Sequence, residues 1–193
     1  GNVLGAEQHG HMEAVGYDLY CKLLNQAVLE LKGQRREEDT YETVVDCDID
    51  AYIPTSYIKN EYQKLDIYKR ISSIENEDEY MDMQDELMDR FGDIPKPVEN
   101  LLRVAGIKAL AHSAYVTEVN INSQEIRLTM YQKAKLSVAG IPAMVDQYRG
   151  DLKFHMAEEP YFTFIDRRKN QTTAGMMERA EELLKQLYEL TEK

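Results

Sequence analysis

Residues 86–102, ELMDRFGDIPKPVENLL, predict that the chain reverses direction between two helices. Apolar residues recur at helical spacing up to Phe91, and Gly92 follows where a left-handed residue commonly ends a helix. Pro95 and Pro97 cannot continue that helix, but proline suits the first turn of a new one. The segment therefore predicts a helical hairpin. The chain before it has a mainly helical pattern, and most of the β pattern lies after it.

Periodicity predicts the remaining elements. Alternation of apolar and polar residues predicts two β-hairpins, over residues 116–131 and 152–165. Residues 136–149 predict a short helix that Ser137 or a nearby residue caps and Gly150 ends, and 173–191 predict an amphipathic C-terminal helix. The predicted class is α+β, with N-terminal helices and the helical hairpin packed with a small, mainly antiparallel sheet.

The helices before the hairpin have apolar residues at i, i+3 and i+4 spacing. Residues 15–33 are predicted to form the first, with Gly33 at its end. Two more are predicted, one from Glu61 and one over 75–91. Their predicted inward residues are Tyr62, Leu65, Tyr68, Ile71 and Ile74 in the first, and Met81, Gln84 or Asp85, Met88 and Phe91 in the second.

Residues 43–53 alternate as a strand does, with Val45, Cys47 and Ile49 on one face. Asp46, Asp48 and Asp50 share the other face, a pattern that invites a divalent-metal hypothesis. Along a strand these carboxylates lie about 7 Å apart and do not converge on one ion. A solvent-facing edge strand, whose charges oppose edge-to-edge pairing, is the preferred interpretation.

Composition excludes several classes of function. The net charge of −12 opposes binding to a phosphate backbone and fits a basic protein partner. There is no apolar run of about 18 residues, no signal peptide and no CxxC pair, so Cys21 and Cys47 are expected to be free thiols in the cytoplasm. His9 and His11 lack an evident third metal ligand. Without a phosphate-binding loop or a nucleophile beside a base, we expect no catalytic, cofactor or metal residues and no enzymatic activity.

Three collinear segments carry a family resemblance: GNVLG with Gln8 and Gly10, IPTSYI followed by KLDIYKRI, and ELMDRFGDIPKPVENLL. Together they resemble the C-terminal region of bacterial transcription-repair coupling factors. The resemblance implies the tail of a superfamily 2 DNA translocase module at 1–16, a connecting helix and linker at 17–39, and a C-terminal regulatory domain at 40–193. It also implies that Gln8 and Gly10 belong to a translocation-coupling loop. ATP and Mg²⁺ would bind upstream of this chain, in a larger parent protein.

In that family the parent displaces stalled RNA polymerase from duplex DNA and recruits nucleotide excision repair. The resemblance implies that the C-terminal domain is autoinhibitory and masks the UvrA-binding N-terminal module of the same protein. The acidic segment 77–89 is the expected interdomain contact, represented by Asp82, Asp85 and Glu86. A docking module that binds a repair or polymerase partner directly is the alternative. A nucleic-acid-binding domain is a third hypothesis, which the charge disfavours, and no membrane contact is expected.

Overall fold

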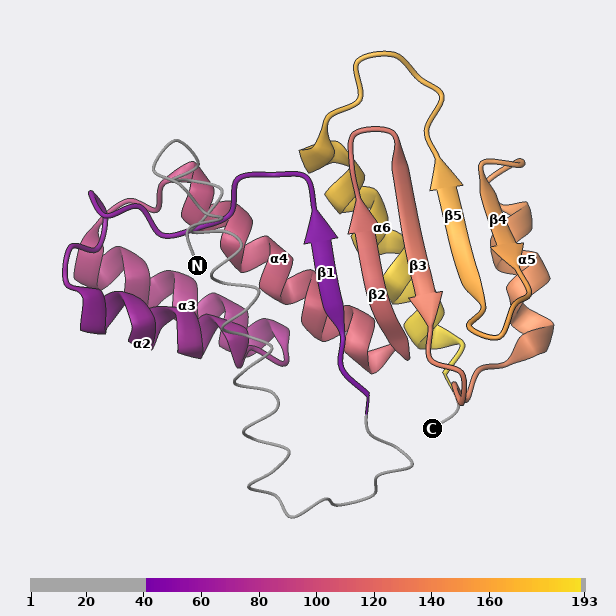
Figure 1. Cartoon of the computed structure of the whole chain (residues 1–193), viewed down its shortest axis with the longest axis horizontal. Coiled ribbons are helices and arrows are strands. Elements are labelled where there is room, and N and C mark those ends of the chain that lie inside the picture. Colours follow the sequence, from indigo (N-terminus) through magenta and orange to yellow (C-terminus); the bar gives the residue numbers. More distant parts are fainter. Residues whose placement is uncertain (1–40, 192–193) are drawn as a thin grey trace, which may run out of the picture. The chain divides into compact units, whose positions relative to one another are not determined.

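The computed structural model describes residues 41–191 (Figure 1). In this range the chain forms two compact units, one of residues 50–106 and one of residues 41–49 together with 107–191. The first unit is helical and the second contains the sheet. The helix α4 (Lys96–Ser113) contributes to both, because the division falls after Gly106.

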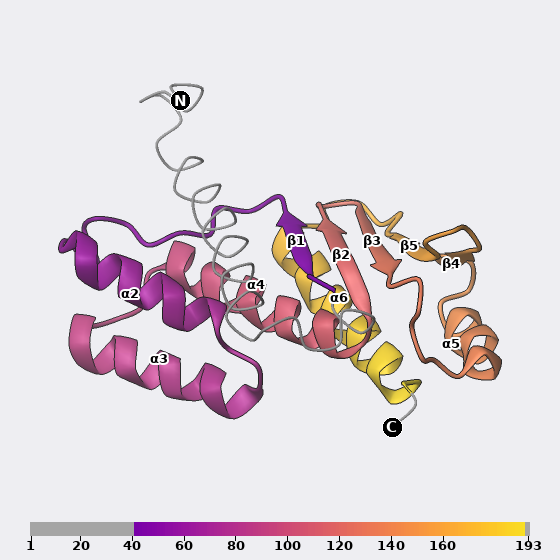
Figure 2. The same cartoon turned by 60° about the horizontal axis from the view of Figure 1, so that its bottom comes forward.

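The helical unit contains the predicted hairpin. The helices α2 (Glu61–Ser72) and α3 (Glu77–Phe91) lie side by side, as Figure 2 shows, and the first part of α4 completes the unit. Fully buried apolar side chains fill its core, each contributing about 1.5–3 kcal/mol. They are Ile53, Ile58, Ile67, Ile71, Leu87, Val98, Leu101 and Leu102.

The predicted inward face of α2 was partly wrong. Tyr68 and Ile71 are buried as predicted, but Tyr62 is 85% exposed and Leu65 is 51% exposed. Lys64 is buried in their place, with its Nζ atom 3.1 Å from Thr55 Oγ1. A lysine can do this because its aliphatic stem packs like an apolar side chain while its ammonium keeps a polar partner. Hydrophobicity alone therefore assigned the wrong face to Tyr62 and Leu65, while Ile74 is buried as predicted.

The predicted inward face of α3 was also partly wrong, although Gln84 and Phe91 are half-buried. Met83 and Leu87 are buried, whereas Met81 and Met88 are 53% and 52% exposed and Asp85 faces solvent. Both sets have helical spacing, so the pattern allowed two different faces of the helix to point inward. The neighbouring helices select one, because Leu87 meets the core of the unit.

The turn between α3 and α4 confirms the special role of Gly92. Its φ of 88° is positive as predicted, but its ψ of −162° is extended and not helical. This region of backbone space is essentially restricted to glycine. Tyr57 closes the turn, since its hydroxyl donates a hydrogen bond to the Gly92 carbonyl at 2.9 Å.

The sheet unit has five strands in the order β1-β2-β3-β5-β4. Their bounds are β1 Val44–Cys47, β2 Val116–Ile121, β3 Glu125–Met130, β4 Leu152–His155 and β5 Tyr161–Ile165. All neighbours are antiparallel except β1, which runs parallel to β2. Both predicted hairpins and the edge position of β1 are confirmed. The long connection between β1 and β2 makes this parallel pairing possible, because a parallel pair cannot be joined by a short turn.

One face of this sheet is covered by α6 (Thr173–Glu189), which crosses behind β2 and β3 in Figure 1. Its predicted apolar stripe is buried, and alternate residues of the strands meet it. The buried residues of α6 are Met176, Met177, Ala180, Leu183, Leu184 and Leu187, and those of the strands include Val119, Ile126, Leu128 and Phe162. The other face carries polar side chains such as Arg127, which lies 4.0 Å from the centre of the Tyr161 ring.

The predicted helix over 136–149 is shorter than expected and divided. A 3₁₀ turn, η3 (Val138–Gly140), leads directly into α5 (Ile141–Asp146), which lies beside β4. Ser137 occupies the position before η3 but makes no capping hydrogen bond with its side chain. Gly150 lies in the following turn with a φ of 93°, four residues beyond the end of α5.

Candidate functional site

The three predicted contact residues of α3 have different surroundings. Asp82 and Asp85 face solvent, but Glu86 is half-buried and paired with two arginines. Its carboxylate accepts hydrogen bonds from Arg70 of α2, at 2.5 Å for the Nη2 atom, and from Arg90 Nη1 at 2.8 Å. These bonds hold the pKa of Glu86 at about 2. Glu86 therefore joins α2 to α3, whereas Asp82 and Asp85 form no such link.

A row of exposed aspartates takes the place of the predicted set. Asp78, Asp82, Asp85 and Asp89 are spaced by four, three and four residues, so they share one side of α3. No ion pair joins any of the four to another side chain within residues 41–191. We call these four residues the acidic face. Asp78 and its neighbours at the start of α3 also interact favourably with the helix dipole.

Several predicted features lie outside the described residues. These are the coupling-loop residues Gln8 and Gly10, the two histidines of the N-terminal loop, the helix predicted over 15–33 and the boundaries at residues 16 and 39. They remain predictions.

The aspartates of the edge strand face solvent, as the alternation of residues 43–53 predicts. Asp46, Asp48 and Asp50 are all exposed, and β1 itself ends at Cys47. Within the part of the chain that the structure describes, no three histidine, cysteine or acidic side chains are grouped to hold a metal ion. In the same part, no helix is both long and apolar enough to cross a bilayer.

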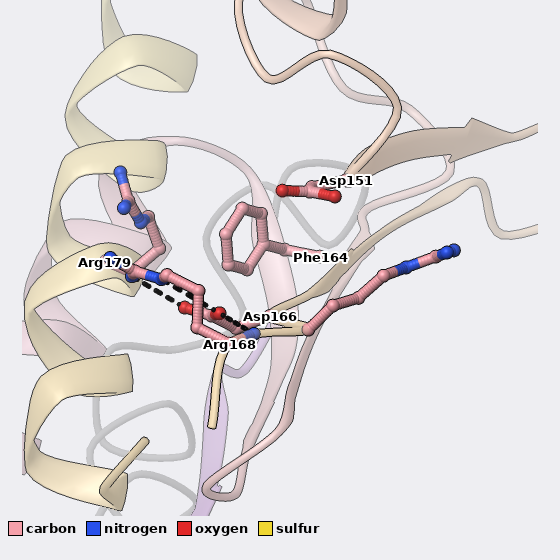
Figure 3. A pocket seen from close by; sticks show the side chains of 6 residues that line it. Asp151, Phe164, Asp166, Arg168 and Arg179 are labelled. Atoms are coloured by element: carbon pink, nitrogen blue, oxygen red, sulfur yellow. Dashed lines mark hydrogen bonds and ion pairs between the residues drawn. The ribbon is translucent and has the colours of Figure 1, made fainter. Parts of the chain in front are cut away.

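A second surface feature, which the sequence interpretation missed, is a solvent-open pocket of about 320 Å³ in the sheet unit (Figure 3). Three arginines and two aspartates surround the edge of a buried aromatic ring. The lining residues are Asp151, Phe164, Asp166, Arg167, Arg168 and Arg179. They come from the start of β4, the end of β5, the segment after β5 and the helix α6.

Asp166 and Arg168 of this pocket are joined by several hydrogen bonds. The Asp166 side chain is only 5% exposed, and its Oδ2 atom accepts a hydrogen bond of 2.8 Å from Arg168 Nη2. Its Oδ1 atom accepts from both the Nε atom and the backbone nitrogen of Arg168, at 3.1 and 2.9 Å. These hydrogen bonds lower the pKa of Asp166. The pair therefore fixes the direction of the Arg168 guanidinium, as a fork-shaped contact does.

Arg179, which belongs to α6, lines the pocket on the side opposite Asp151 (Figure 3). Its guanidinium carbon lies 5.3 Å from the centre of the Phe164 ring and 5.9 Å from that of Tyr148. Its Nη1 atom also donates to Glu182 at 2.9 Å. Cation–π contacts and one ion pair thus hold this guanidinium against the sheet.

One feature of the sequence points to this pocket. Residues 167–169 are three consecutive cations in a chain whose net charge is −12. The run resembles an ordinary polar connection, and Arg179 is ten residues further along, so no sequence spacing groups them. The fold does so because α6 packs beside the end of β5.

The described geometry can be compared with known proteins. Residues 47–141 match the model of the TRCF domain. The chain is 41% identical over 140 residues to the transcription-repair-coupling factor of Bacillus subtilis (strain 168), and 41% identical over 141 residues to that of Staphylococcus haemolyticus (strain JCSC1435). Each alignment covers 72% of this chain but only 12% of the relative, so the chain spans a small part of the length of these proteins.

A crystal structure of the C-terminal domain of a transcription-repair coupling factor has the same fold. The TM-score is 0.61 at 24% sequence identity, and the match covers 78% of this chain and 94% of the other. The predicted α+β class and the predicted resemblance are both confirmed. The chain belongs to the transcription-repair coupling factor family, and residues 47–141 are its TRCF domain.

Proposed function

We propose that this chain is the non-catalytic regulatory domain of a transcription-repair coupling factor and masks the UvrA-binding N-terminal module of the same protein. The parent would be an ATP-dependent DNA translocase that displaces stalled RNA polymerase and recruits nucleotide excision repair. It would bind ATP and Mg²⁺ upstream of this chain. Family membership supports the parent's role, and the acidic face is the observation that supports a contact with a basic surface.

The acidic face suits a reversible contact. A single exposed ion pair contributes about 0.2–1 kcal/mol, so four separate carboxylates orient a partner without holding it permanently. A masked and an unmasked state would then differ by a few kcal/mol, a gap that engagement of the parent with polymerase can reverse. We expect strong dependence on salt for the same reason.

Competition tests this proposal directly. The chain is titrated with the N-terminal module of its parent, with and without UvrA. Masking predicts that the chain and UvrA exclude each other from the module. Binding of the chain to UvrA itself, with no affinity for the module, contradicts masking and supports the alternative of a docking domain.

Reversing charge on the acidic face should weaken the masking contact. The double variant Asp82→Lys/Asp85→Lys is expected to bind the N-terminal module at least tenfold more weakly, because two attractive charges become repulsive. Glu158→Lys/Glu159→Lys changes the net charge equally at an exposed turn of the sheet unit and is the matched control. Equal loss in the two variants would show that net charge matters and that the acidic face does not.

The docking alternative has one observation in its favour. Met81 and Met88 are each about half exposed and adjoin Asp82 and Asp89 in sequence. Methionine is common on surfaces that adapt to different partners. The competition experiment separates the two functions, because only masking requires the N-terminal module.

A further inference from the structure

We propose that the pocket beside Phe164 binds a carboxylate side chain from an acidic segment of a partner protein. All of its lining residues belong to the sheet unit and none lies on α3, so this proposal stands apart from the masking contact. It assigns an interaction to Arg167, Arg168 and Arg179.

Preorganisation is the first argument. An ordinary surface arginine loses side-chain entropy when it grips a ligand. Here Asp166 already orients Arg168 through three hydrogen bonds, and the aromatic rings already position Arg179. The Arg168 side chain nevertheless remains 67% exposed, so its Nη1 edge can still donate to a ligand. The two guanidiniums are therefore already ordered in the fold, and a ligand that binds them loses less free energy to side-chain entropy.

Charge is the second argument. The lining carries three guanidiniums and two carboxylates, and Asp166 is buried under Arg168. Arg167 is exposed and forms no hydrogen bond or ion pair within residues 41–191. Figure 3 shows the Asp151 carboxylate across the Phe164 ring from Arg179. The guanidiniums outnumber the carboxylates by one, so the lining has a net positive charge that a single carboxylate can balance.

The same charges favour a peptide over a nucleic acid. A phosphate backbone presents a charge every few ångströms and needs an extended basic surface. This pocket is bordered by Asp151 and Glu182 and belongs to a strongly acidic chain. A carboxylate on a flexible segment can enter alone, and the planar guanidiniums match its two oxygens.

The test uses the full chain labelled with ¹⁵N and a probe peptide of two aspartates and two glutamates flanked by glycines. Amide shifts are followed in low salt. We expect the shifts to concentrate at residues 164–168 and 179. A peptide with asparagine and glutamine at the acidic positions should give no shifts.

Variants then assign the contact. Arg167→Ala and Arg179→Ala should each weaken peptide binding about threefold to fivefold, the change expected for one exposed ion pair. Lys185→Ala removes an exposed cation from the same helix, outside the pocket, and should leave binding unchanged. Arg167 has no partner within the described residues, so that variant remains informative even if Arg179→Ala disturbs packing.

Three results would overturn the proposal. They are the absence of peptide binding at millimolar concentration, equal weakening by Lys185→Ala, and tighter binding of a duplex oligonucleotide than of the acidic peptide at the same residues. The last result would assign the pocket to nucleic acid.

Discussion

Glu86 is an acidic residue that the sequence predicts on the surface but that links two helices in the fold. In sequence it is one of many acids between Glu77 and Asp89, and only the arginine four residues later distinguishes it from Asp82 or Asp85. In the fold its two oxygens accept hydrogen bonds from Arg70 and Arg90. Such shared, fork-shaped pairs are stronger than isolated surface pairs because both oxygens are used.

Replacing Glu86 with glutamine should lower the free energy of unfolding by about 0.5–1 kcal/mol at neutral pH, allowing for the partial exposure of both arginines. The pKa of Glu86 falls from its ordinary 4.5 to about 2 on folding. Its contribution is therefore complete above about pH 5 and is lost as pH falls toward 2. Urea unfolding of wild type and Glu86→Gln should converge over that range.

The control for this prediction is Asp85→Asn, which neutralises an exposed neighbour that forms no ion pair in the described part of the chain. It should change stability by less than about 0.5 kcal/mol. If the two variants behave alike at neutral pH, the pairing with Arg70 and Arg90 contributes nothing measurable.

At the scale of elements, three helices begin with a side-chain cap. The side chains of Asn60, Asn76 and Thr172 each accept a hydrogen bond from the backbone nitrogen three residues later, at 3.0, 2.9 and 3.0 Å. At the start of α3, the Glu79 carboxylate also accepts a hydrogen bond of 2.9 Å from the backbone nitrogen of Glu75. These bonds satisfy amide groups that a helix start leaves without partners. They explain why α2, α3 and α6 begin within one residue of the cap.

Replacing Asn76 with alanine should therefore destabilise the chain by about 1 kcal/mol, the usual cost of losing an N-cap. Helicity at 222 nm during thermal unfolding reports the loss. Asn76→Asp keeps an oxygen acceptor and adds favourable charge at the helix start, so it should match or exceed wild type. An equal loss in both variants would contradict the capping role.

At the scale of the whole molecule, the sheet unit is built from two separated parts of the chain. β1 lies at the edge of the sheet, parallel to β2, although α2, α3 and α4 intervene in sequence. Side-chain contacts hold this segment in addition to the hydrogen bonds between β1 and β2. The Thr43 hydroxyl donates to the Val116 carbonyl at 2.7 Å, and the Tyr41 ring stacks on Tyr131 with centres 4.6 Å apart.

A chain shortened to residues 50–193 should consequently lose stability in the sheet unit relative to one of residues 41–193. Burial of Val45 alone is expected to contribute about 1.5–3 kcal/mol. Hydrogen exchange of β2 and β3 amides should accelerate at least tenfold in the shorter chain. Amides of α3 serve as the internal control, and unchanged exchange in β2 would show that β1 is dispensable.

Within residues 41–191, local chemistry in the sequence was sufficient to predict most of the elements and their order, although the helix expected over 136–149 is divided. Gly92 and the two prolines after it specify a reversal because few residues tolerate that backbone, and alternation specifies both hairpins because strand side chains point to opposite faces in turn. The stripe of α6 predicted its buried face correctly, since nearly all its apolar residues lie on one side.

Only the tertiary structure decided which faces and which charges matter. On α2 and α3 apolar residues occur on two sides, so the packing of neighbouring helices chose Ile67 and Leu87 over Leu65 and Met88. The pocket beside Phe164 and the pairing of Glu86 with Arg70 join residues from different elements, which no local spacing encodes. Elements are determined by interactions a few residues apart, whereas burial and charge pairing depend on contacts that exist only after the chain has folded.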